Sequence, residues 1–501
     1  MSGVFQGLTR GVPGVGARER AAPDSCFEAS ENIARAASLK FTPDKLFLGV
    51  IGAGIERTDI GERYAQGGAE IGVADDRHAL TIAGSRAGKG RAAIIPNMLR
   101  YQGSVLAIDP KGELALATAK TRAEKLDQKV LVVDPFGTTG ATLTPYQAGF
   151  NPLAGMRPKS MVEDAVLITD ALVIPGTGDP HWDESARTII EGVILEVATA
   201  DRFEGRRDLA TVRSLMAEGD RFEDPDSGEV SSGLMVLEAF MRVSEVSAVR
   251  EAAADFFERP ERERDSVLST ARRHLRPLAF PEIAASMTGE SFDLADLKTG
   301  ATTIYLCLPG RHMGTCGRWL RLFVNLALQA MERTPGQPAA RCPVLFVLDE
   351  FASLGHMRQI EDAAGQIAGY GVKLWPILQD LGQLKSLYKE RWETFMGNAG
   401  ILQFFGNNDL TTLQWISKRL GSTTIVQLSG SVVTPRAAQA GATGESFAPR
   451  TTAILEPDEV ALVFGRSDPL LRQLIIRAGY APMILQRAYY DKHHAFAEDR
   501  S

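Results

Sequence analysis

The chain has 501 residues, and 44% of them are hydrophobic, which is enough to bury a core and favours two or three domains over one. Charged residues make up 23%, which excludes a disordered composition. The net charge of −7 neither supports nor excludes nucleic-acid binding, which would need a local basic surface or the lining of a ring.

The cysteines and apolar runs indicate an intracellular chain. The four cysteines form no CxxC pair, so we expect reduced thiols in a cytosolic protein, with Cys307 in the core and no zinc site. No segment resembles a signal peptide. The best membrane candidate, 46–55, is far shorter than the roughly 20 residues that a spanning helix needs. We expect it to form a buried strand or a short helix.

In chain order, residues 1–75 are expected to form a flexible N-terminal arm and lead-in, with regular structure beginning near Ala79. Short apolar runs then alternate with helical stretches, which predicts βαβ units and a parallel sheet in 76–158, the first part of a nucleotide-binding domain. The strands are expected at 79–83, 104–108 and 129–133, and the helices at 91–99 and 113–125.

The pattern changes over 159–290, which we predict to be an inserted all-α domain. Asp183 is a candidate N-cap for its second helix. The helices are expected at 161–172, 184–200, 208–216, 233–240 and 247–257.

Residues 291–501 are expected to complete the nucleotide-binding domain, because apolar strands return there. Residues 429–446, rich in Gly, Ala, Ser and Thr, predict a mobile loop. The strands are expected at 302–308, 344–348, 372–378, 401–405 and 423–426, and the helices at 317–333, 357–370 and 410–420.

The first chemical signal is the segment 83–90, AGSRAGKG, between an apolar strand and a helical stretch. Polyphosphate needs converging backbone N–H groups, and glycine lets the backbone approach closely. The helix N-terminus adds partial positive charge, and Lys89 would reach the β- and γ-phosphates. Ala83 and Gly90 depart from the pattern GxxxxGK[ST], so a glycine-rich turn with a surface lysine is the alternative. Pro96 predicts a short or kinked helix after the loop.

The second signal is VLFVLDE at 344–350, an apolar strand followed by two acids. Ligands bind at the carboxyl edge of a doubly wound sheet. Asp349 can hold Mg²⁺ directly or through water, and Glu350 can act as general base on the attacking water. A strand that ends in a solvated turn is the alternative, which the position after a phosphate loop disfavours.

The third signal is LWPILQD at 374–380, where Gln379 ends another apolar strand. A glutamine there can contact the γ-phosphate or the attacking water, and a polar residue that only caps the strand is the alternative. The three signals together predict nucleoside-triphosphate hydrolysis, with Lys89, Glu350 and Gln379 as catalytic residues and Asp349 as the metal ligand.

From about Asp76 to its C-terminus, the chain resembles the coupling proteins of type IV secretion and conjugation systems, the TraG/TraD-type ATPases. The segments that carry the resemblance, in the family's order, are AGSRAGKGRAAIIPNML, GSVLAIDPKGE, KVLVVDPFG, FNPL, HWDESARTII, DSVLSTARRHL, VLFVLDEFASLGHM, ILQDLGQLKSLY and LEPDEV.

The resemblance implies an α/β fold: a RecA-like P-loop NTPase core with a mostly parallel sheet, plus the inserted all-α domain. ATP and Mg²⁺ would be the cofactors, and Gly90 fits because GKG is common in the family. Asp109 would lie on the strand beside the P-loop, near the nucleotide, and a turn-former before Pro110 is the alternative. The residues expected to bind the nucleotide are Gly84, Ser85, Arg86, Ala87, Gly88, Lys89, Gly90, Arg91 and Asp109.

We therefore expect an ATP-driven, homo-hexameric motor that delivers DNA, single-stranded and bound to a relaxase, or effector proteins to the subunits of a type IV secretion channel. It would act in the cytoplasm at the inner face of the bacterial membrane. Family members usually begin with transmembrane helices, which this sequence lacks, so membrane contact would be indirect or through a partner. The alternatives are a nucleotide-dependent docking platform without translocation and another P-loop DNA-packaging ATPase.

Two features stay open at this point. A ring ATPase needs a cation from the neighbouring subunit, for which Arg358, Arg391 and Arg419 are candidates, although an ordinary surface role is the favoured alternative for each. The arginine-rich segment 261–276 suits phosphate contacts, and a solvated face with internal ion pairs is the alternative.

Overall fold

The chain folds into two compact units. Unit 1 consists of the chain up to Asn97 and from Ile377 onward, and unit 2 is Met98–Pro376. No helix in the described part of the chain is long and apolar enough to cross a membrane. The computed structural model describes residues 26–59, 61–176, 178–289, 291–430 and 445–500.

Unit 1 is a mixed sheet with helices around it. Its strands are β1 (Leu46–Ile51), β2 (Gly54–Arg57), β3 (Arg63–Gln66), β4 (Ala69–Val73), β5 (His78–Ala83), the end of β12 (Val372–Leu378), β13 (Ala399–Phe405), β14 (Ser422–Gly430), β15 (Glu445–Ala453), β16 (Arg472–Arg477) and β17 (Met483–Gln486). Its helices and helical turns are α1 (Ser30–Arg35), η2 (Ala37–Leu39), η3 (Gly90–Ile94), α2 (Ile95–Arg100), α14 (Leu381–Tyr388), η9 (Lys389–Arg391), α15 (Trp392–Asn398), α16 (Leu410–Leu420), α18 (Pro457–Val463), η10 (His494–Phe496) and η11 (Glu498–Arg500).

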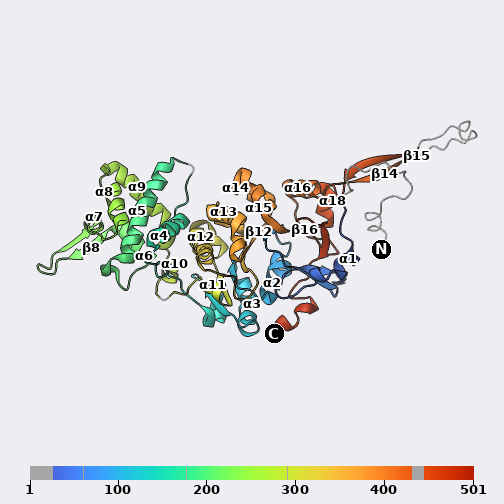
Figure 1. Ribbon diagram of the computed structural model, residues 1–501, viewed down its shortest axis with the longest axis horizontal. Coiled ribbons are helices and arrows are strands. Elements are labelled where there is room, and N and C mark those ends of the chain that lie inside the picture. The colour runs from blue at the N-terminus through green and yellow to red at the C-terminus, as the bar shows by residue number, and fades with distance from the viewer. Residues whose placement is uncertain (1–25, 60, 177, 290, 431–444, 501) are drawn as a thin grey trace, which may run out of the picture. The chain divides into compact units, whose positions relative to one another are not determined.

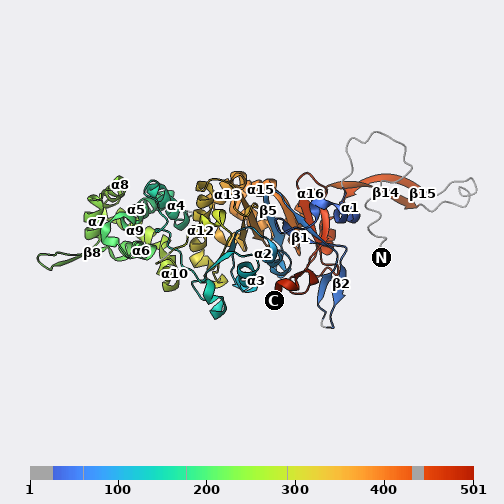
Figure 2. The ribbon, with the colours of Figure 1, turned by 60° about the horizontal axis from the view of Figure 1, so that its bottom comes forward.

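The strand pairing in unit 1 places the loop that follows β5 beside the loop that follows β13. Strand β5 is parallel to β13 on one side and to the end of β12 on the other. Antiparallel pairs then continue from β13 through β16, β17 and β1 to β4. Strands β2 and β3 form a separate hairpin (Figure 2). All six residues of β5 are buried, as expected for a strand covered on both faces.

Unit 2 contains a parallel sheet and the helical insertion. The parallel sheet runs in the order β7 (Lys129–Val133), β10 (Thr302–Leu306), β6 (Val105–Ile108), β11 (Val344–Leu348) and the start of β12. Unit 2 also contains the strands β8 (Asp220–Glu223) and β9 (Val230–Gly233). Its helices and helical turns are α3 (Glu113–Glu124), η4 (Gly140–Tyr146), α4 (Met161–Leu172), α5 (Pro180–Thr199), η5 (Asp201–Phe203), α6 (Leu209–Glu218), α7 (Leu234–Arg242), α8 (Ser247–Phe257), α9 (Glu261–His274), η6 (Arg276–Ala279), α10 (Pro281–Ser286), α11 (Asp296–Thr299), α12 (Gly310–Arg333), η7 (Phe351–Leu354), α13 (Arg358–Gln366) and η8 (Ile367–Tyr370).

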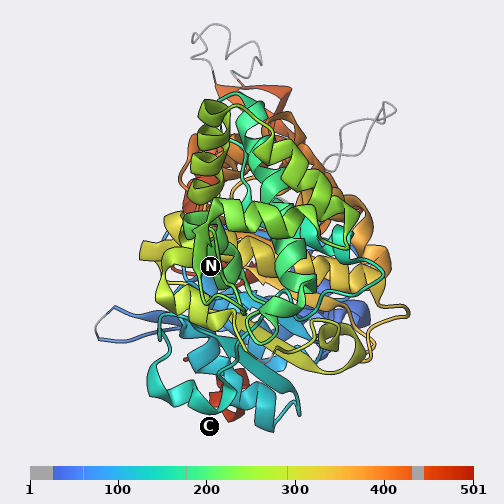
Figure 3. The same cartoon turned by 90° about the vertical axis from the view of Figure 1, so that its left-hand side faces the viewer.

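The insertion is a bundle around one central helix. Helix α5 packs against α4, α6, α8 and α9, and Figures 1 and 3 show these helices gathered together. A buried apolar stripe on α5, which includes Ile189, Val193 and Val197, faces these neighbours. The five predicted helices are therefore present. The insertion also contains α9, α10, the turns η5 and η6, and the small β8–β9 hairpin.

Two local predictions were wrong. Regular structure begins well before Ala79, because α1 and strands β1 to β4 precede it; the run at 46–51 is the buried strand β1, one of the two expected forms. The second insertion helix begins at Pro180 rather than after Asp183. Its N-cap is Asp179, whose side chain accepts a hydrogen bond from the His181 N–H, and proline suits the first helical position.

Strands β14 and β15 occupy both ends of the segment expected to be a mobile loop. Its centre, 431–444, lies outside the described residues, as do residues 1–25 of the expected arm. Cys307 is fully buried, as predicted.

Candidate functional site

The predicted phosphate loop follows β5 in unit 1, and its first turn fits only glycine. The Gly84 N–H donates to the Phe405 carbonyl (3.1 Å), and the Ala87 N–H donates to the Gly84 carbonyl (3.1 Å). A Cβ atom on Gly84 would lie 1.9 Å from the carbonyl oxygen of Gly406. Glycine is therefore required here by the approach of a second backbone.

The rest of the loop turns back to start a helix. Arg86 has φ 56° and Gly88 has φ 89°, so left-handed residues are interleaved with right-handed ones. Such alternation points successive N–H groups into one concavity, which binds anions. Lys89 is helical and half-buried at the start of η3, while Ser85 and Arg86 are exposed. The arrangement is able to hold phosphate oxygens at a helix N-terminus.

Gly90 and Pro96 shape the helix that follows. A Cβ atom on Gly90 would meet nothing within 4 Å, so glycine is not sterically required there. The first turn is a π-helical turn in which the Ile95 N–H donates to the Gly90 carbonyl. Pro96 has no N–H for the carbonyl four residues earlier, and the helix ends at Arg100. The predicted short helix is therefore present.

Gln379 lies at the carboxyl edge of the parallel strands of unit 1, as predicted. Leu378 pairs with Ile82 of β5, so Gln379 follows β12 at the level where the phosphate loop begins. Its carbonyl accepts a hydrogen bond from Asn407 Nδ2 (3.1 Å). Asp380, and not Gln379, caps the next helix by accepting from the Gln383 N–H (2.9 Å).

In unit 2, Asp109 and Asp349 follow two neighbouring parallel strands at the same level, because Ile108 of β6 pairs with Leu348 of β11. Asp109 is almost fully buried, and its Oδ2 accepts from the Ala115 N–H (2.9 Å). Burial raises the pKa of Asp109 from its ordinary value of 3.8 to about 6, and the charge of Asp349 adds to the effect. Asp109 therefore organises the turn before α3 and also faces a second carboxylate.

The expected place of Asp109 needs one correction. We predicted that its strand lies beside the strand of the phosphate loop. Strand β6 pairs with β10 and β11, whereas β5 pairs with β12 and β13. The sequence carried no sign of this order, because strand order in a parallel sheet depends on which crossover helices cover which face.

Glu350 has a left-handed backbone, with φ 53° and ψ 42°. Its N–H donates to Asp349 Oδ1 (3.0 Å), and its carbonyl accepts from the Ser353 N–H (2.8 Å). A non-glycine residue in this region is strained by roughly 1–3 kcal/mol, and such strain is common at active sites. Its side chain directly follows strand β11, as predicted, and is half-buried.

The donor set of unit 2 fits Mg²⁺. Hard carboxylate oxygens are the ligands that this ion takes, and it keeps several waters when only one or two carboxylates bind it. Burial raises the pKa of Asp109 and the charge of Asp349 adds to the rise, so a bound cation would favour the ionised form of Asp109. Within the described residues no group of three or more His, Cys, Asp or Glu side chains converges on one point, so the remaining ligands would come from water and phosphate.

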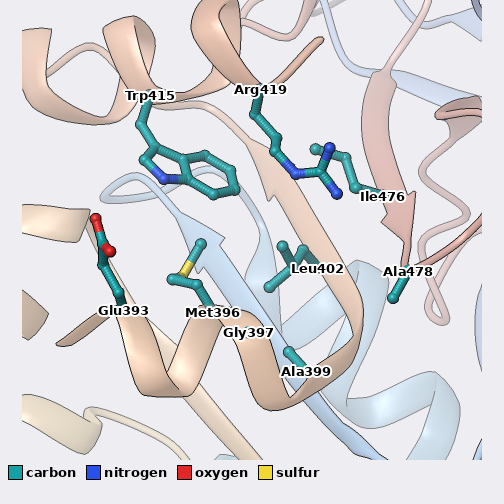
Figure 4. A pocket seen from close by; sticks show the side chains of 9 residues that line it. All are labelled: Glu393, Met396, Gly397, Ala399, Leu402, Trp415, Arg419, Ile476 and Ala478. Carbon is teal, nitrogen blue, oxygen red and sulfur yellow. The ribbon is translucent and has the colours of Figure 1, made fainter. Parts of the chain in front are cut away.

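The arginine candidates lie in different settings. Arg358 is exposed and lies 3.6 Å from Asp362. Arg391 is an exposed residue of η9. Arg419 lines a pocket of about 340 Å³ in unit 1, together with Trp415 on its own helix and apolar side chains of α15, β13 and β16 (Figure 4). The structure leaves all three as candidates.

The arginine-rich helix α9 is partly tied into the insertion. Arg272 donates to the carbonyls of Met216 (2.9 Å) and Ala217 (2.7 Å) at the end of α6. Arg273 donates to Asp183 (2.8 Å). These two arginines therefore join α9 to α6 and to α5. For them this favours internal ion pairs and hydrogen bonds over phosphate contacts.

Sequence reasoning missed the residues that contact the phosphate loop from distant parts of the chain. Asn407 follows β13 as Gln379 follows β12, and the run ILQFFGNN had the same form of an apolar strand with a polar end. Arg487, Tyr489 and Asp491 also lie against the loop, and nothing local in their sequence marks them.

Comparison with known sequences is consistent with this geometry. The chain matches the family described as Type IV secretory system Conjugative DNA transfer over residues 36–500. The conjugal transfer protein TraG of Escherichia coli is 29% identical over 400 residues, which are 76% of this chain and 61% of TraG. VirD4 of Rhizobium rhizogenes is 26% identical over 427 residues, which are 82% of this chain and 58% of VirD4. The chain thus spans less than two thirds of the length of these relatives.

The fold also has solved counterparts. The trigonal form of the bacterial conjugative coupling protein TrwBdeltaN70, in complex with sulphate, matches with a TM-score of 0.64 and 14% identity, over 95% of this chain and 96% of that one. The unbound monoclinic form matches with a TM-score of 0.61 and 16% identity, over 90% and 96%. At these identities the likeness shows the fold, a RecA-like core with inserted helices, as predicted.

Proposed function

This chain belongs to the family of type IV secretory conjugative DNA transfer proteins, and on that premise we propose that it hydrolyses ATP to deliver cargo to a type IV secretion channel. The observation that carries the proposal is the glycine-rich loop at 84–90. Its backbone N–H groups lie at the N-terminus of a helix, and it contains Lys89. Solved structures of TrwB in complex with ADP and Mg²⁺ and with a non-hydrolysable ATP analogue support ATP and Mg²⁺ as the ligands.

In the proposed site, the loop from Gly84 to Arg91 surrounds the phosphates. The N–H groups of Gly84 and Ala87 close the turn, the remaining N–H groups bind the phosphate oxygens, and the exposed side chains of Ser85 and Arg86 face the ligand. Lys89 places a cation on the β- and γ-phosphates. Charge that develops on the phosphate oxygens is stabilised because these donors are already held by the turn. Gly84 secures that turn through its contact with Gly406.

Asp349 and Asp109 would hold magnesium, which would neutralise phosphate charge and align the phosphates when bound. Glu350 accepts a proton from the attacking water while the water oxygen bonds to the γ-phosphorus. The bond from the γ-phosphorus to the bridging oxygen breaks, and ADP and phosphate result. Gln379 contacts the γ-phosphate, so the departure of this phosphate changes the contacts at the end of β12. Asn407 holds the end of this strand through a hydrogen bond to the Gln379 carbonyl.

The cargo is proposed to be DNA, single-stranded and bound to a relaxase, or an effector protein, and the working assembly is proposed to be a homo-hexamer. Membership of the conjugative DNA transfer family and the likeness to the conjugal transfer protein TraG support DNA transfer with a type IV system. We propose that the protein acts in the cytoplasm at the inner face of the membrane and contacts the membrane through a partner.

The test compares the ATPase rate of the purified chain with and without single-stranded DNA and measures its mass with nucleotide. We expect DNA-stimulated hydrolysis and a mass of six subunits. A Lys89→Ala variant should still bind cargo but neither hydrolyse ATP nor support transfer. Normal transfer by that variant would favour a docking platform over a motor.

A further inference from the structure

A segment near the C-terminus lies along the second half of the phosphate loop and is joined to its middle and to the residue that follows it. This tail segment, residues 487–493, follows β17. Arg487 is fully buried, and its Nη1 donates to the Ala87 carbonyl (2.9 Å). The Tyr490 N–H donates to the Arg91 carbonyl (2.9 Å). The residues between these two bonds, on both segments, are therefore held close together.

Tyr489 stands between these two bonds with its ring beside the loop. A Cβ atom on Gly88 would lie 3.4 Å from Cε1 and 3.6 Å from Oη of Tyr489. The guanidinium carbon of Arg91 lies 4.5 Å from the ring centroid. Asp491 fixes that guanidinium through two hydrogen bonds, of 3.0 Å to Nε and 2.6 Å to Nη2. The Tyr489 ring therefore lies beside Gly88 of the loop, with the Arg91 guanidinium stacked on it.

The packing of the tail does not account for the exposure of this ring. Arg487 and Ala488 are fully buried and anchor the segment, whereas Tyr489 is half-exposed. The backbone after it is also set without the ring, since the Tyr489 carbonyl accepts from the N–H groups of Lys492 (3.0 Å) and His493 (2.7 Å). The side chain is thus held in place and still offers surface to a ligand.

A nucleotide whose phosphates occupy the loop brings a flat, apolar base to this place. The base is joined to the α-phosphate only through the ribose, so it must lie near the start of the helix that carries Arg91. Aromatic rings and arginine planes are the side chains on which bases stack, and stacking accepts any base because each has a π-face.

We infer that Tyr489, steadied by Arg91 and Asp491, is the stacking platform for the nucleobase of the bound nucleotide. The inference rests on the proposed function and adds to it the part of the site that recognises a nucleoside rather than phosphate alone. It assigns no hydrogen bond to the edge of the base, so ATP and GTP are expected to depend on Tyr489 to the same extent.

The experiment measures binding of ATP, GTP and inorganic tripolyphosphate, each with Mg²⁺, to the wild-type chain and to Tyr489→Ala and Tyr489→Phe by calorimetry. Tyr489→Ala should weaken ATP and GTP binding by roughly 10-fold, within the range for a base stacked on an aromatic side chain. Tripolyphosphate has no base, so its affinity should stay unchanged, which also shows that the variant is folded. Tyr489→Phe keeps the ring and should bind all three ligands as the wild type does.

Two results would overturn the inference while leaving the proposed function intact. One is unchanged ATP affinity in Tyr489→Ala. The other is an equal loss of ATP and tripolyphosphate affinity, which would mean that the ring only supports the loop. A wild-type chain that binds neither ligand would instead remove the proposed function, and the inference with it.

Discussion

Gly84 and Gly406 come so close that a Cβ atom on Gly84 would lie 1.9 Å from the Gly406 carbonyl oxygen. The two residues end neighbouring parallel strands, since Ala83 pairs with Phe405. The phosphate loop is therefore built on a contact between two backbones and does not depend on the local glycine pattern alone.

Replacing Gly84 by alanine should damage both the loop and the stability of unit 1. The added methyl group cannot be accommodated by a side-chain movement, because its neighbour is backbone. We expect a loss of about 1–3 kcal/mol, typical of overpacking, and at least a roughly 10-fold loss of ATP affinity. Thermal unfolding and nucleotide titration measure the two effects.

Gly90→Ala is the matched control, because a Cβ atom there meets open space and alanine suits a helix better than glycine does. Its unfolding midpoint should equal or exceed that of the wild type. Equal midpoints for the Gly84 and Gly90 variants would show that the close contact is not real.

Replacing Asp109 by asparagine should stabilise the chain at pH 7.5 and weaken its response to magnesium. The folded state binds the Asp109 proton more tightly than the unfolded state does, because the folded pKa is about 6 against an ordinary 3.8. The wild type therefore loses stability as pH rises from about 4 to about 6, and asparagine removes that loss. The gain at pH 7.5 should be about 1–3 kcal/mol.

The pH dependence distinguishes this explanation from a general packing effect. Below pH 4 both side chains are neutral, so the difference in unfolding midpoint between Asp109→Asn and the wild type should disappear. A gain that persists at pH 4, or a less stable variant at pH 7.5, would contradict the explanation.

Asp183 is expected to hold the helical insertion together. Its buried carboxylate accepts hydrogen bonds of 2.8 Å each from the Gly176 N–H, Arg273 and His274. Asp183→Ala leaves these donors without their partner, so we expect a loss of roughly 3–5 kcal/mol, seen as an earlier unfolding transition or faster proteolysis of the insertion.

Asp179→Ala, in the same helix, removes only the N-cap and should cost about 1 kcal/mol. If the two alanine variants unfolded alike, Asp183 would have no special role in joining α5 to α9.

The sequence predicted the parts of the site that are written in consecutive residues. The run from Gly84 to Lys89 and the pair Asp349 and Glu350 stand where strands end, and apolar strands followed by charged residues are a local signal. The helices of the insertion were also predicted from a local signal, because their apolar periodicity repeats over several turns.

Residues that act through distant contacts could not be predicted. The partner of Gly84 is more than 300 residues away, and the partners of Ala87 and Arg91 are Arg487 and Asp491, 400 residues away. The left-handed backbone of Glu350 also has no signal, since neither glycine nor asparagine marks it. The Asp179 cap was missed because Asp183 offered the same side chain, although Pro180 favoured the earlier start.

The most direct test of the central claim is the ATPase rate of Glu350→Gln, measured beside its ATP affinity and beside the surface control Glu332→Gln. The account predicts that Glu350→Gln binds ATP within a few-fold of the wild type and turns it over at least about 100-fold more slowly, because the proton acceptor is lost while the loop is intact. The control should match the wild type. Undiminished turnover by Glu350→Gln would contradict the account.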